Sequence, residues 1–322
     1  FSQKRPSWLL TSPIAAMIPK HKLFIFLLLS IFPNTPLADN KTIPLVFSAM
    51  GCGPYNSADL RAAKRYVKQE NKAQISQFMI HLGDICPGVA ARDGKITEKS
   101  YSDIKELFTK SNTIPSYIIP GDNEWNDRPD PDVGWDLWCK HLLALEKNFK
   151  TEWQNVRQHE RPENFAFVAN SVLVIGINLP GGRIHDKEEW ARRFRENVSW
   201  IKAQFAKHQS EVGAAVVCAQ ANPIGGSGVA AVANNRFSSF TKPFGKLAAN
   251  FGKPVLFLHA DGHKWIVDKP WKDAPNITRV QVDRLEPNFP PVQITVDTTA
   301  EKPFRFERRL AKPAWNISKT KG

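Results

Sequence analysis

The sequence lacks several features that assign a protein class by themselves. It has only four cysteines, and no two of them have the CxxC spacing of a structural zinc site. It has no long block of lysine or arginine and no nucleic-acid motif, although its net charge is +13. We find no internal repeat and no linker long enough to divide the chain. These absences argue against zinc-finger, repeat and nucleic-acid-binding proteins, and the positive charge is best interpreted as a general field that attracts anions.

Long apolar runs are also scarce. The one clear run is Leu23–Phe32, which follows a basic head at 20–22 and precedes Pro33–Ala38, which ends on a small residue. Ten residues are too few to span a bilayer, and the order basic, apolar, small is typical of a secretory signal peptide. We therefore predict that residues 1–38 comprise upstream residues and a signal peptide, with Met17 as the expected start. No membrane span is expected after its removal, and the protein should be secreted or periplasmic.

The remaining composition is that of a globular protein. Apolar residues make up 42% and charged residues 23% of the chain, and the 20 Phe and 10 Trp indicate a core with many aromatic side chains. We assign residues 39–300 to one domain. Residues 301–322 are assigned to a last strand and a basic C-terminal tail.

The first half alternates between short apolar runs and amphipathic segments. Strands are predicted at 43–49, 77–82 and 117–119, and helices at 59–72, 101–109 and 134–149. This alternation predicts crossover connections and a sheet that is at least partly parallel. Each strand precedes a glycine-bearing loop, and parallel strands would bring these loops, GCGP, GDICPG and GDNEW, to one edge of the sheet.

The second half is richer in strands. We predict strands at 164–168, 172–177, 213–220 and 255–259, and helices at 187–208 and 237–251. Four alternating runs follow, and we expect them to be antiparallel strands that close a second sheet, at 264–267, 278–282, 292–296 and 304–308. A glycine-rich loop within 222–233 lacks the spacing and the lysine of a nucleotide-binding loop.

Polar side chains follow five of the predicted strands: Cys52, Asp84, Asp122 with Asn123, Gln220, and the group His259, Asp261 and His263. Taken singly, each could be a turn, a helix cap or a structural histidine. Together they offer the carboxylate, amide and imidazole groups that hydrolytic metal centres gather from separate loops. Two such metals can hold a phosphate and the attacking hydroxide.

The motifs resemble those of the calcineurin-like metallophosphoesterases, whose strand ends read Asp-x-His, Gly-Asp, Gly-Asn-His-Glu, a lone His and Gly-His-x-His. HLGDICPG, PGDNEW, VVCAQANP and LHADGHKWIVDKP stand at the last four of these places. The chain is more similar to a secreted, poorly characterised branch with Gly-Asp-x-Pro-Tyr, PGDNEW and HGD-x-H motifs. The resemblance covers residues 43–283. It implies an α/β four-layer sandwich of two mixed β-sheets flanked by helices.

The resemblance also implies roles for individual residues. Asp84 would be the carboxylate that bridges two metals, Asp122 stands at an asparagine-ligand position, and Asp261 and His263 would be the last pair of ligands. The full set of implied metal ligands is Cys52, Asp84, Asp122, Asn123, Gln220, His259, Asp261 and His263. The implied catalytic residues are Asn123, Glu124 and His263.

Several of these positions depart from the family pattern. Asn123 stands where the catalytic histidine would be, so Glu124 or a metal-bound water would have to protonate the leaving group. Gln220 replaces a histidine and Cys52 replaces an aspartate. Because nitrogen ligands are exchanged for oxygen, we expect one or two divalent ions, with Mn, Mg or Ca favoured over Zn or Fe. Cys52 is either a free thiol or part of a disulfide with Cys86.

Two functions therefore remain open. The first is an exported phosphoesterase that hydrolyses a small phosphate mono- or diester through attack by a metal-activated hydroxide. The alternative is a catalytically degenerate relative that binds a phosphate-bearing ligand or a partner without turnover. The sequence leaves the oligomeric state open.

Overall fold

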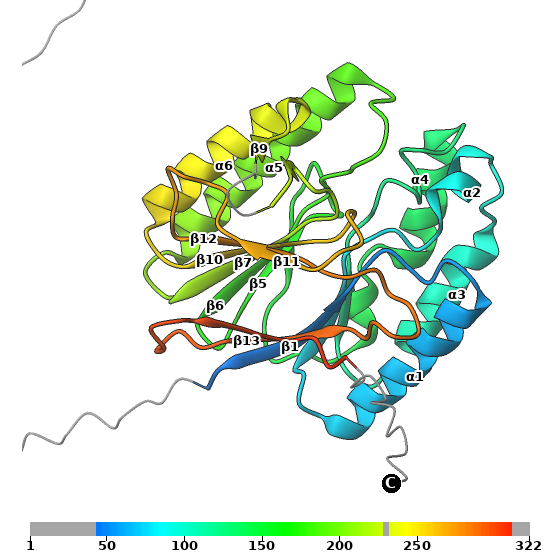
Figure 1. Cartoon of the computed structure of the whole chain (residues 1–322), viewed down its shortest axis with the longest axis horizontal. Helices are drawn as coiled ribbons and strands as arrows, with labels where there is room; N and C mark the ends of the chain where they lie inside the picture. The colour runs from blue at the N-terminus through cyan, green and yellow to red at the C-terminus, as the bar shows by residue number, and fades with distance from the viewer. Residues whose placement is uncertain (1–42, 228–231, 311–322) are drawn as a thin grey trace, which may run out of the picture. The chain divides into compact units, whose positions relative to one another are not determined.

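The computed structural model describes residues 43–227 and 232–310 (Figure 1). The predicted signal segment at 1–38, and the end of the predicted tail from residue 311, lie outside the described residues. Within the described chain, every helix is too short or too polar to cross a membrane.

The first sheet has five strands in the order β14-β13-β1-β2-β3. Three neighbouring strands, which end at one edge of the sheet with β3, are parallel and come from the first half of the chain: β1 (Leu45–Met50), β2 (Phe78–His81) and β3 (Ser116–Ile118). Two antiparallel strands complete it, β13 (Val292–Val296) and β14 (Phe304–Glu307). The helical segments of this half are α1 (Ser57–Ala73), α2 (Gly88–Arg92), α3 (Glu98–Thr109), α4 (Pro131–Leu142) and η1 (Leu145–Asn148).

The second sheet has seven strands in the order β11-β12-β10-β7-β6-β5-β4. Its parallel strands are β6 (Val172–Gly176), β7 (Ala214–Cys218), β10 (Val255–His259) and β12 (Ile277–Gln281). Its antiparallel edges are β4 (Val156–Arg157), β5 (Phe165–Ala169) and β11 (Ile266–Asp268). The helices of this half are α5 (Lys187–His208) and α6 (Ser238–Phe251), with η3 (Asn235–Phe237) before α6 and the short pair β8 (Ile224–Gly225) and β9 (Val232–Ala233).

Alternation along the strands divides the apolar side chains among three cores. In β2, Phe78 and Ile80 pack between the two sheets, whereas Met79 packs with residues of α1, α3 and α4. In β10, Leu256 faces the space between the sheets and Phe257 packs with α5 and α6. Because these strands are covered on both faces, their sequences are continuously apolar and do not alternate between apolar and polar residues. The predicted α/β class, with two mixed sheets flanked by helices, is confirmed (Figure 1).

One prediction about the sheets is corrected. We expected the last four runs to close the second sheet as antiparallel strands. Instead, β12 is parallel to β10, and β13 pairs antiparallel with β1 in the first sheet, with Leu45 opposite Val296. The alternation in β13 indicates one buried face but does not identify the sheet that the strand joins. The open edge of β1 accepts β13, whose Val292, Ile294 and Val296 then enter the core between the sheets.

Arg279 of β12 joins the second sheet to the loop that follows β7. Its fully buried guanidinium forms two hydrogen bonds to Asp268, at 2.7 and 2.5 Å. It also donates to the carbonyls of Ile224 and Gly226, both at 3.0 Å. The charge is therefore buried together with a carboxylate and several acceptors, which is the condition for tolerating it in a core.

Arg279→Met is expected to lower the free energy of unfolding by about 3–5 kcal/mol, because it leaves a buried carboxylate without the guanidinium. Urea denaturation measures this change. Lys99→Met is the matched control, because Lys99 forms an exposed pair with Asp103 and should cost less than about 1 kcal/mol. Equal losses in the two variants would contradict the role of Arg279.

Candidate metal centre

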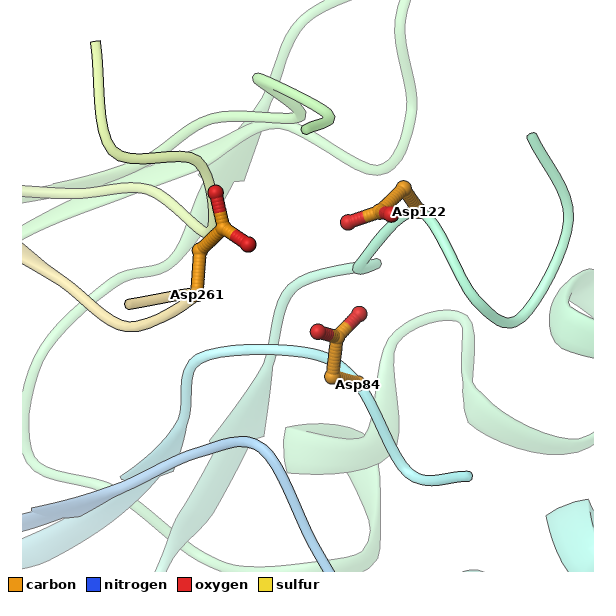
Figure 2. A group of neighbouring side chains, drawn as sticks. All are labelled: Asp84, Asp122 and Asp261. Carbon is orange, nitrogen blue, oxygen red and sulfur yellow. The ribbon is translucent and has the colours of Figure 1, made fainter. Parts of the chain in front are cut away.

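Three aspartates from separate loops converge where the carboxyl ends of the two sheets meet. Asp84 follows β2, Asp122 follows β3 and Asp261 follows β10. One carboxylate oxygen of each lies within 4.8 Å of the others. Figure 2 shows the three side chains directed toward one another across a common space. This is the edge at which open α/β sheets hold their ligands.

The loops reach this arrangement through unusual backbone conformations. Asp84 and Asp261 have left-handed φ angles of 62° and 67°, a region that aspartate tolerates better than most residues. Gly121 lies so close to Asp84 that a Cβ atom there would be 2.2 Å from both its backbone nitrogen and its Oδ1. The Pro-Gly-Asp sequence therefore serves a close approach between the loops after β2 and β3.

The electrostatics of the three carboxylates favour a bound cation. Asp84 and Asp122 are 3% and 5% exposed, and Oδ1 of Asp122 is buried with no hydrogen-bond partner among the described residues. Burial, and then the charges of neighbouring carboxylates, raise the pKa of both groups well above the usual range. Burial also raises the pKa of Asp261. Concentrated buried negative charge and an unsatisfied oxygen fit a divalent metal with oxygen ligands.

Two predicted ligands, Gln220 and Asn123, lie beside the carboxylates, and the side-chain amide of each is engaged in a hydrogen bond. Gln220 donates from Nε2 to Oδ2 of Asp84 at 3.0 Å. Asn123 donates its backbone N–H to Oδ1 of Asp84 at 3.4 Å and its side-chain amide to the carbonyl of Cys86 at 2.9 Å. In this structure they orient Asp84 and its loop.

Cys52 follows β1 and lies between two of the aspartate loops. The Asp261 N–H donates to its sulfur at 3.1 Å, and the thiol donates to Oδ2 of Asp84 at 3.5 Å. Burial, with the charges of Asp84 and Asp261, raises the pKa of the thiol well above its usual value. All four cysteines of the described chain are free, so the disulfide with Cys86 that the sequence left open is not formed.

Glu124 is fully buried beneath the aspartates. Its Oε1 accepts from the N–H of Gly121 at 3.1 Å, while Oε2 has no partner among the described residues. Burial raises the pKa of Glu124 to about 7, partly opposed by the Gly121 N–H and supported by the charge of Asp122. Glu124 can thus change its charge near neutral pH.

The two predicted histidines are placed differently from each other, and the group of possible ligand atoms within 4.8 Å in the described chain includes neither. The buried ring of His259 lies 5.6 Å from that of Phe257, on the helix-covered side of the second sheet. The ring of His263 is exposed, with Nε2 3.5 Å from the hydroxyl of Tyr55. Burial lowers the pKa of His259 to about 3, so this ring is neutral at physiological pH.

The sequence did not indicate the loop after β6, which borders the carboxylates. A Cβ at Gly181 would lie 3.0 Å from oxygens of both Asp122 and Asp261. Arg236 donates to the carbonyls of Gly181 and Gly182, at 3.1 and 2.5 Å, and its guanidinium stacks 4.9 Å from the centre of the Trp190 ring. Only the Gly-Gly pair in the sequence hints at a close approach of backbone to this site.

Gly182→Ala is expected to weaken divalent-metal binding at least about tenfold, because misplacing a ligand loop costs at least that much. A Cβ at this position would lie 2.1 Å from Asp127 and 2.5 Å from Asp122. Gly252→Ala is the control, because Gly252 also has a left-handed φ but no described atom within 4 Å of an added Cβ. Isothermal titration with Mn²⁺ should find the control unchanged in affinity, and equal weakening would show that strain alone is responsible.

Neither a protein-family model nor a curated protein matches the sequence. Among solved structures, a dimetal phosphatase from Danio rerio is similar with a TM-score of 0.52 and 10% identity, covering 79% of this chain and 96% of that one. TT1561 of Thermus thermophilus has a TM-score of 0.47 and 13% identity, with coverage of 83% and 99%. The NAD nucleotidase of Haemophilus influenzae has 0.44 and 8%, with coverage of 83% and 49%.

The first of these similarities is close enough to compare architectures, and at this identity it establishes the fold alone. The similarity extends over 79% of this chain, and so over most of both sheets. The described chain has a fold similar to that of this dimetal phosphatase.

Proposed function

We propose that the protein is a metal-dependent phosphoesterase that hydrolyses a small phosphate mono- or diester. The observation that carries this proposal is the convergence of Asp84, Asp122 and Asp261 within 4.8 Å, with a buried oxygen of Asp122 left unpartnered. The fold, which is similar to that of a dimetal phosphatase, supports it. We also propose that the protein acts outside the cytoplasm, because residues 1–38 have the pattern of a signal peptide.

Each residue at the centre has a distinct task in this proposal. Asp84, Asp122 and Asp261 hold the cation, for which Mn, Mg or Ca suits the oxygen ligands best. When bound, a divalent cation polarises a phosphoryl oxygen and offsets the negative charge that accumulates during attack. The Gly181 N–H donates to Gln220, and Gln220 in turn donates to Asp84, which keeps that carboxylate oriented.

We assign proton transfer to His263 rather than to Asn123. The amide of Asn123 is engaged by the carbonyl of Cys86 and has no titratable proton. His263 is exposed on the rim, two residues after Asp261, and contacts the hydroxyl of Tyr55. It can therefore exchange a proton with a leaving group that enters from solvent.

Hydrolysis of p-nitrophenyl phosphate and its bis ester tests the function, after treatment with EDTA and readdition of Mn²⁺, Mg²⁺, Ca²⁺ or Zn²⁺. Asp84→Asn is expected to lower kcat/KM by at least about 100-fold, the typical cost of removing a main electrostatic contact. Asp103→Asn removes a carboxylate from an exposed ion pair on α3 and should leave activity unchanged.

The alternative is a non-catalytic protein that binds a phosphate-bearing ligand. Cys52 and Asn123 favour it, because each stands where the resembling family has a functional side chain. The alternative is established, in place of hydrolysis, if the wild-type protein binds Mn²⁺ and phosphate but shows no turnover with any of the four metals.

A further inference from the structure

We infer that the centre holds a single divalent cation, and that Cys52 and Gln220 use hydrogen bonds to occupy the side of Asp84 where a second cation would bind. The inference rests on the proposed metal dependence and concerns the number of ions. The two oxygens of Asp84 have unequal surroundings. Oδ2 accepts from Gln220 at 3.0 Å and from Cys52 at 3.5 Å, whereas Oδ1 accepts, from the described residues, one long bond donated by the Asn123 N–H at 3.4 Å.

The orientation of the Gln220 amide follows from its other neighbour. The N–H of Gly181, which can only donate, is 2.9 Å from Oε1 of Gln220. The oxygen of this fully buried side chain must therefore face Gly181, and its NH₂ group must face Asp84. A donor pointing at Oδ2 takes the position that a metal would need.

Cys52 approaches the same oxygen, Oδ2 of Asp84, from the loop that follows β1 of the first sheet. Its side chain is buried, with a relative exposure of 1%, and links the loops of Asp84 and Asp261 by accepting from one and donating to the other. Its loop is fixed by a hydrogen bond from its own N–H to the carbonyl of Gly83, at 2.9 Å. The two hydrogen bonds thus join carboxylate loops that a shared cation would otherwise join.

On the other side of the cluster, the described residues leave carboxylate oxygens that a cation could bind. Oδ1 of Asp122 has no partner among the described residues, and Oδ1 of Asp84 is only weakly engaged. A Cβ at Gly181 would touch Asp122 and Asp261 at 3.0 Å each, so these two carboxylates border one space. Three carboxylates around one space match a single hard cation.

Manganese binding to the purified protein, stripped of metal by EDTA, tests the inference. Isothermal titration is expected to give one Mn²⁺ per chain, and electron paramagnetic resonance to give the spectrum of an isolated ion. Two ions per chain, or the spectrum of an exchange-coupled pair, would overturn the inference. Binding of no Mn²⁺ would overturn both the inference and the proposed metal dependence.

The double variant Cys52→Asp/Gln220→His restores the side-chain types of the resembling family and should bind two ions. Cys139→Asp adds a carboxylate at a half-buried cysteine of α4 and should still bind one. A folded double variant that binds one ion would overturn the roles given to Cys52 and Gln220. If it does not fold, the wild-type stoichiometry still decides the number of ions.

One bound ion without hydrolysis would refute only the proposed function, and two bound ions with hydrolysis would refute only this inference.

Discussion

Asp122→Asn is expected to stabilise the metal-free protein and to abolish its stabilisation by Mn²⁺. In the folded state the pKa of Asp122 is raised, first by burial and then by the charge of Asp84. Stability from a raised carboxyl pKa is present below the unfolded-state pKa and is lost as the pH rises through the folded-state value. At neutral pH the buried carboxylate therefore opposes folding, and a neutral amide of the same shape should add about 1–3 kcal/mol.

In the presence of metal the expected order changes, because Mn²⁺ should stabilise the wild type far more than the Asp122→Asn variant. Mn²⁺ at 100 times its Kd should stabilise the wild type by about 2.7 kcal/mol, because it binds only the folded state. The variant should gain almost nothing. Urea unfolding with EDTA and with Mn²⁺ measures both effects, and Asp103→Asn serves as the control for loss of a surface carboxylate. A variant less stable than the wild type in EDTA would contradict the carboxylate repulsion that we describe.

The second large effect concerns pH. In EDTA, the free energy of unfolding should fall as the pH rises from about 4.5 to about 7, the interval between the ordinary pKa of Glu124 and its value in the folded protein. This difference corresponds to a loss on the order of 3 kcal/mol from Glu124 alone. The sign follows from a raised pKa, since the unfolded chain releases the proton first.

Glu124→Gln should remove that part of the pH dependence, because glutamine keeps an acceptor for the Gly121 N–H and cannot ionise. Glu106→Gln, at an exposed position on α3, should leave the profile of the wild type unchanged. Unfolding by urea at several pH values provides the measurement. A profile of Glu124→Gln identical to the wild type would show that other groups govern the interval.

Much of the fold was predictable because local patterns and burial agree. The helix predicted at 187–208 coincides with α5, whose N-cap Asp186 accepts from the N–H groups of Glu188 and Glu189. The strands predicted at 164–168, 172–177 and 255–259 match β5, β6 and β10 within one residue. The short helix α2 was missed, because five residues contain too little periodicity to detect.

The sequence by itself determined which residue types follow the strands, and hence that oxygen-bearing side chains such as those of PGDNEW follow several of them. It could not determine which of these side chains meet. Asp84, Asp122 and Asp261 converge because parallel strands of two sheets end at a common edge. His259 is directed elsewhere because strand alternation turns its ring toward the helices. The hydrogen bonds of Cys52 and Gln220 to Asp84 depend on distances between loops far apart in the chain, and only the tertiary structure decides those distances.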